Sequence, residues 1–137
     1  MPKLLENDYY RVDYDEERDL VIVRRSATVL PQPEMGAQVL AMVLSAALPY
    51  AGTPMLSDLR LAKATNDPRY EDAIRPQLIR MRELFPLTAR VVKTASGRLQ
   101  ILRMARERKD SRLSAVFTDE AEALAFLEAN RPPRSRK

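Results

Sequence analysis

The side chains that could do chemistry in this chain are carboxylates, hydroxyls and arginines, because the sequence holds no cysteine and no histidine. This composition excludes thiolate nucleophiles, cysteine metal sites and the commonest general base. The most suggestive group is Asp58, near the end of a predicted strand over residues 53–59, with Thr65 and Asp67 in the loop that follows it. Two carboxylates beside a hydroxyl could move a proton. No glycine-rich phosphate loop accompanies them, however, and we therefore expect no enzyme, no cofactor and no metal site.

The elements that must position these residues alternate along the chain. An opening hairpin is predicted from two alternating stretches, residues 9–13 and 20–24, on either side of a polar turn. Strands and helices then alternate, so the order β-β-α-β-α-β-α-β-α predicts an α/β fold with a mixed, mostly parallel sheet of about five strands. Pro76 is expected to kink or divide the second helix. Thr118 is expected to cap the last helix. The later predicted elements are helix 35–48, strand 53–59, a helix from Pro68, strand 89–94, helix 98–112, strand 113–117 and the helix after Thr118.

One domain is predicted, over residues 9–129, between an N-terminal extension (residues 1–8) and a basic tail (residues 130–137) that we expect to be disordered. No apolar run approaches the roughly 20 residues of a membrane helix. The first residues lack the apolar core of a secretory signal. The expected location is therefore the cytoplasm, without membrane insertion.

Three patterns carry a resemblance to a known family. The strand over residues 53–59 ends in Asp58-Leu59, residues 89–94 form a strand followed by an arginine-bearing helix, and residues 116–127 read as a closing strand and helix. Together they resemble the STAS domain (sulphate transporter and anti-sigma-factor antagonist), and more closely its SpoIIAA-like branch. The resemblance implies a STAS-type α/β fold and a non-catalytic regulatory module that docks other proteins.

Members of this kind carry a serine that a kinase phosphorylates, at the start of the helix after the central strand. Here residues 64–68 read Ala-Thr-Asn-Asp-Pro, without serine or glycine, so the usual switch residue is missing. Thr65 is the hydroxyl that could serve as a phosphosite, and Ser57, inside the strand, should be less available to a kinase. The favoured alternative is that Thr65, Asn66 or Asp67 caps the next helix.

Two surfaces are predicted to bind a partner protein, which could be a kinase, an anti-sigma-like protein, a scaffold protein or a second copy of the chain. One is the loop over residues 60–69. The other is the outer face of helix 35–48, opposite a predicted core face that includes Met42 and Val43. This outer face carries no charge beyond Glu34, so we expect something to cover it. A homodimer, another protein or the C-terminal helix of the chain itself could cover that face. The predicted partner-binding residues are Ala41, Leu44, Ser45, Leu48, Arg60, Lys63, Thr65, Asn66, Asp67 and Arg69.

Two other functions stay open. Residues 90–137 hold 12 Lys/Arg against 6 Asp/Glu, so the positive charge of the chain lies in its last third. Helix 98–112 and the tail could therefore bind nucleic acid or another polyanion. A hydrophobic-ligand carrier of the SEC14 type is the third interpretation, with methionines lining a pocket. The cations of the alternative basic surface are Arg98, Arg103, Arg106, Arg108, Lys109 and Arg112.

Overall fold

The computed structural model describes residues 1–62, 67–94 and 114–131. Its centre is a mixed sheet of six strands that lie side by side in chain order. The first two pairings are antiparallel and the other three are parallel. The strands are β1 (Lys3–Glu6), β2 (Tyr10–Asp15), β3 (Leu20–Arg25), β4 (Met55–Asp58), β5 (Thr88–Val91) and β6 (Ser114–Phe117).

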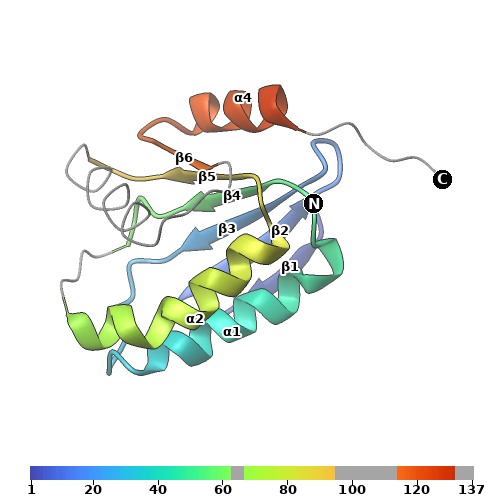
Figure 1. Ribbon diagram of the computed structural model, residues 1–137. Coiled ribbons are helices and arrows are strands. Elements are labelled where there is room, and N and C mark those ends of the chain that lie inside the picture. The colour runs from blue at the N-terminus through green and yellow to red at the C-terminus, as the bar shows by residue number, and fades with distance from the viewer. Residues whose placement is uncertain (63–66, 95–113, 132–137) are drawn as a thin grey trace.

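Helices cover both faces of the sheet. Helices α1 (Met35–Ala47) and α2 (Pro68–Leu84) lie on one face, and α4 (Glu120–Asn130) lies on the other (Figure 1). A short 3-10 helix, η1 (Leu48–Tyr50), follows α1. In the part of the chain that the structure describes, no helix has the length and apolar character needed to cross a membrane.

The predicted α/β class and mixed sheet are confirmed, but the number and order of the strands differ from the prediction. Residues 3–6, expected to precede the domain, form β1, which pairs antiparallel with β2. They do so because Leu4 and Leu5 pack against the apolar cluster under α1. The fourth predicted strand, residues 89–94, corresponds to the shorter β5.

Helix α2 is continuous through Pro76, so of the two predicted effects of this proline, a kink or a division, the division is excluded. Ile74 and Met81 are buried on the side of α2 that faces α1, and this packing supports the helix across the one hydrogen bond that proline cannot donate. The N-cap of α2 is Asp67, one of the three predicted candidates, and its carboxylate accepts a hydrogen bond from the Arg69 N–H. At the start of α4, the cap is Asp119 rather than Thr118.

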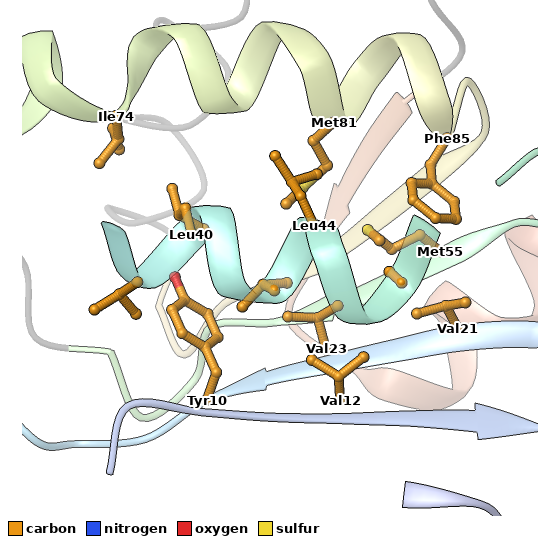
Figure 2. Close-up of a cluster of buried hydrophobic side chains, with 13 residues drawn as sticks. Tyr10, Val12, Val21, Val23, Leu40, Leu44, Met55, Ile74, Met81 and Phe85 are labelled. Atoms are coloured by element: carbon orange, nitrogen blue, oxygen red, sulfur yellow. The ribbon is translucent and has the colours of Figure 1, made fainter. Parts of the chain in front are cut away.

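The outer face predicted for helix 35–48 is partly wrong. Leu44 is only 6% exposed, whereas Met42, assigned to the core face, is exposed. Figure 2 shows Leu44 between α1 and α2, near Met81. The physical reason is that α1 buries two sides, one against the sheet and one against α2. The cover over Leu44 therefore comes from the chain itself, through α2 rather than through the C-terminal helix.

Gly36 lies where α1 packs against Tyr70 and Ile74 of α2. A Cβ at this position would lie 2.8 Å from Ile74 Cγ2 and 2.8 Å from Tyr70 Cε1, both closer than side chains tolerate. Glycine therefore allows the first turns of the two helices to pack directly against each other.

We expect Gly36→Val to lower the free energy of unfolding by about 2–3 kcal/mol, because the added side chain must displace Tyr70 and Ile74. Urea unfolding followed by circular dichroism measures the loss. Gln38→Val is the matched control, because it adds the same β-branched residue at an exposed position of α1 and should cost less than about 1 kcal/mol. Helix propensity alone would make Gly36→Val slightly favourable, because valine is a better helix former than glycine. Equal losses in the two variants would therefore show that the contact with α2 does not account for the effect.

Candidate functional site

The carboxyl ends of the parallel strands form one edge of the sheet, which we call the carboxyl edge. The strand register places Arg24 of β3 beside Asp58 of β4, Asp58 beside Val91 of β5, and Val91 beside Phe117 of β6. Functional side chains gather at such edges in α/β proteins because the connecting loops leave the sheet there. Among the described residues at this edge, Arg24 and Asp58 are the charged pair that the register joins directly.

Arg24 and Asp58 both point to the face of the sheet that α4 covers. Alternation along the strands explains this, because residues two positions earlier, Ile22 and Leu56, belong to the apolar cluster under α4. That cluster also holds Leu127 of α4 itself. The strands thus carry apolar residues under the body of α4 and end in charged residues beside its first turn.

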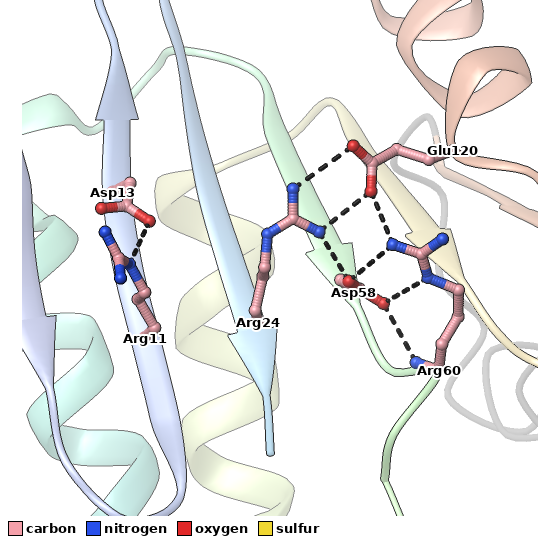
Figure 3. Close-up of polar contacts among 6 residues, drawn as sticks. All are labelled: Arg11, Asp13, Arg24, Asp58, Arg60 and Glu120. Atoms are coloured by element: carbon pink, nitrogen blue, oxygen red, sulfur yellow. Dashed lines mark hydrogen bonds and ion pairs between the residues drawn. The ribbon is translucent and has the colours of Figure 1, made fainter. Parts of the chain in front are cut away.

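Four side chains form a closed network at this place, which we call the charged network: Arg24, Asp58, Arg60 and Glu120 (Figure 3). Asp58 Oδ2 accepts from Arg24 Nη1 at 2.6 Å and from Arg60 Nη2 at 2.9 Å. Glu120 Oε1 accepts from Arg24 Nη1 at 2.9 Å and from Arg60 Nη2 at 2.7 Å. Each carboxylate therefore lies between the same two guanidinium groups.

Arg60 also binds Asp58 through its Nε and its backbone. Its Nε donates to Asp58 Oδ1 at 3.0 Å, and its backbone N–H donates to the same oxygen at 3.1 Å. The bond from Leu59 N–H to the Val91 carbonyl, 2.8 Å long, continues the sheet pairing one residue past β4. The first residues of the loop after β4 are thus fixed to the sheet and to α4.

The charged network is ionised at neutral pH. Burial opposes ionisation of Asp58, whose side chain is 11% exposed, but the hydrogen bonds from Arg60 and Arg24 outweigh it and lower the pKa of Asp58 to about 2. A hydrogen bond from Arg24 likewise lowers the pKa of Glu120, against its burial. Two carboxylates that stay charged and paired hold no proton to exchange near pH 7, so this geometry suits positioning rather than acid–base chemistry.

The loop over residues 60–69 is only partly described. Arg60 belongs to the charged network, and Asp67 and Arg69 lie at the start of α2, where Arg69 Nη2 and Asp67 Oδ2 are 3.1 Å apart. Lys63, Thr65 and Asn66 lie outside the described residues, so the structure does not describe the predicted phosphosite at Thr65. Leu61, within this loop, is 64% exposed.

The remaining predicted residues fall in different places. On α1, Leu44 is buried and Ala41 is half-buried, while Ser45 and Leu48 are exposed at its C-terminal end. Ser57 is half-buried within β4. Helix 98–112, with the cations proposed to bind polyanions, and the tail beyond residue 131 lie outside the described residues. Within residues 1–62, 67–94 and 114–131, no three His, Cys, Asp or Glu side chains are grouped so that they could hold a metal ion.

Sequence reasoning found Asp58 and Arg60 but missed Arg24 and Glu120 as their partners. Arg24 is 34 residues from Asp58, and Glu120 is 96 residues from Arg24. A signal was present, since Arg24 ends a predicted strand and Glu120 begins a predicted helix. It could be used only once the strand order was known.

We predict that the Asp58 carboxylate contributes to the acid sensitivity of folding. Its folded-state pKa lies below the ordinary value, so its contribution is complete above about pH 4 and is lost as the pH falls toward 2. Between pH 5 and pH 2, the free energy of unfolding should fall by about 2 kcal/mol more in the wild type than in Asp58→Asn. Urea unfolding at several pH values tests this, and identical pH profiles would contradict it.

We predict that Glu120 stabilises the fold more than its neighbour Glu122. Both lie in the first turn of α4, where the helix dipole favours a negative charge, but of the two only Glu120 accepts from Arg24 and Arg60. Glu120→Gln should therefore lower the free energy of unfolding by about 1 kcal/mol more than Glu122→Gln does. Thermal and urea unfolding of the two variants measure the difference, and equal losses would show that the network adds no stability.

Comparison with known proteins assigns no family to this chain. No protein-family model, no curated protein and no solved structure matches it. The resemblance to the STAS domain therefore stays a prediction, and the candidate site rests on the geometry of the charged network and of the loop that it anchors.

Proposed function

We propose that this chain is a cytoplasmic, non-catalytic protein-docking module of the STAS type, which binds its partner protein through the loop after β4. The observation that carries the proposal is the charged network, which fixes the start of that loop while Leu61 stays 64% exposed. A large apolar side chain on an anchored loop is a suitable centre for a protein interface.

Both described ends of the loop are held. At the first end, the Ala62 N–H donates to the Leu59 carbonyl at 3.1 Å, which folds the chain back directly after β4. At the other end, Asp67 caps α2. A segment whose ends are already ordered loses less conformational entropy when it binds, so more of the contact energy appears as affinity.

The charges around Leu61 favour docking over chemistry. Asp58 and Glu120 are neutralised by Arg24 and Arg60, so the carboxyl edge offers a fixed polar rim rather than a reactive group. Such a rim sets orientation and specificity around an apolar centre. The partner that fits is a protein with an apolar pocket for Leu61 and polar groups around it. In the sequence, Thr65 belongs to the same loop, and its phosphorylation would add negative charge to that loop.

The exposed end of α1 is the second surface to be compared. Leu48, in η1, is exposed like Leu61 but lies where the chain enters β4, at the opposite end of that strand. Each leucine belongs to one of the two predicted docking surfaces. A variant of one leucine is therefore the control for a variant of the other.

We expect Leu61→Glu to reduce capture of the partner at least about tenfold, because a charge would enter the apolar centre of the interface, while Leu48→Glu leaves capture unchanged. The measurement is affinity capture of the tagged full chain from nuclease-treated lysate of its own cells, with captured proteins quantified by mass spectrometry. Circular dichroism confirms that both variants fold.

Three results would contradict the proposal. Loss of capture with Leu48→Glu alone would place docking at the end of α1. Equal capture by all three proteins would exclude both leucines. Wild-type capture that nuclease abolishes would instead favour the polyanion-binding interpretation of residues 98–112 and the tail.

A further inference from the structure

Strand β1 is the outermost strand on one side of the sheet, and the charged network lies farther along the sheet, at β3 and β4. It pairs with β2 on one side, and on its other side no strand of the described chain adds to the sheet. The side chains at its two ends, Lys3 and Glu6, are 51% and 49% exposed. An open strand edge can pair with a strand of another molecule, and proteins commonly protect such edges with charge.

The charges on β1 are arranged so that they match a second copy of the same strand. The strand reads Lys3-Leu4-Leu5-Glu6, with opposite charges at its ends and two leucines between them. Antiparallel pairing about a twofold axis between the leucines places Lys3 opposite Glu6 of the second copy, and the axis repeats this pair. Parallel pairing would instead place like charges side by side.

Both charged side chains lie on the same face of the sheet, which is necessary if the pairs are to form. In the ladder, Lys3 stands opposite Asp13 and Glu6 opposite Arg11, with an irregularity between Lys3 and Leu5. Lys3 Nζ lies 2.8 Å from Glu6 Oε1, and Arg11 Nη1 lies 3.8 Å from Glu6 Oε2. The face therefore carries alternating charges up to its edge, and a second copy would continue the alternation.

Asp13 gives an independent indication that the charged residues on this face of β1 and β2 lack a hydrogen-bond donor. It is 5% exposed, and although its Oδ2 accepts from Arg11 Nε, its buried Oδ1 has no hydrogen-bond partner in the structure. Figure 3 shows Asp13 and Arg11 on the same face of β2. On β1, the cross-strand neighbour of Asp13 is Lys3, whose ammonium group is bound to Glu6 instead. An ammonium has three donors. In the paired form, Lys3 would stand between Asp13 and Glu6 of the second copy.

We infer that two copies of this chain associate through antiparallel pairing of their β1 strands, which joins two six-stranded sheets into one. Leu4 and Leu5 are half-buried against the core, and the second copy covers part of their remaining surface. Only four residues of each copy pair, so the dimer is weak and its population depends on protein concentration.

The test uses sedimentation equilibrium of the full chain over a range of concentrations with two charge variants. Glu6→Lys places lysines opposite each other in a homodimer, and Lys3→Glu places glutamates opposite each other. The twofold axis doubles each repulsion, so each variant alone should show a dissociation constant raised at least about tenfold. An equimolar mixture of the two variants should dimerise again, because every cross-strand pair then joins a lysine and a glutamate.

Glu83→Lys is the matched control, since it makes the same charge change at an exposed position of α2 and should dimerise like the wild type. Recovery in the mixture shows that the single variants are folded, because an unfolded chain could not regain pairing. The inference is overturned if the wild type stays monomeric throughout, if either variant dimerises as strongly as the wild type, or if the mixture fails to associate.

Discussion

The carboxylate of Asp58 imposes the constraint on which the carboxyl edge depends. It lies at the end of β4 with little exposure, and a charge in that position must be compensated by donors. Arg24 reaches it because β3 and β4 pair in parallel, and Arg60 reaches it from two residues along the chain. Two guanidiniums beside one carboxylate leave an excess positive charge, which Glu120 neutralises. The first turn of α4 is thereby fixed against the loop after β4.

The two faces of the sheet show how neighbouring residues of one strand serve different helices. On β3, Val21 and Val23 pack under α1 and α2, whereas Ile22 packs under α4. A strand buried on both faces has a continuous apolar sequence, and this continuity requires helices on both sides. The Arg24 side chain lies on the same face of the sheet as Ile22, two residues earlier. The alternation of side chains that builds the core therefore also places the charged network.

Local signals in the sequence predicted the elements whose stability is local. Alternating residues predicted the hairpin of β2 and β3, and Asp67-Pro68 predicted the start of α2. The signals failed where burial depends on distant segments. A helical projection of α1 gives the angles between side chains but not how many sides are covered, so Leu44 was assigned to the surface and Met42 to the core.

The other failures have the same cause. Strand β1 has four residues and an irregular register, too short for alternation to be recognised, and it is stabilised by pairing with β2. The contact between Arg24 and Glu120 depends on strand order, which no local pattern contains. The resemblance to a family indicated an α/β fold, but it could not place these side chains.

The two groups of charges differ in a way that explains what each can do. Asp58 is nearly buried, so its pairs with Arg24 and Arg60 cannot be exchanged for pairs with another molecule without leaving a buried charge uncompensated. Lys3 and Glu6 are half exposed, and an exposed pair contributes little to the stability of one molecule. Exchanging that pair for the equivalent pairs with a second copy therefore costs little, while the leucines between them gain cover. Charges of the first kind fix the shape of a docking surface, whereas charges of the second kind are free to select a partner.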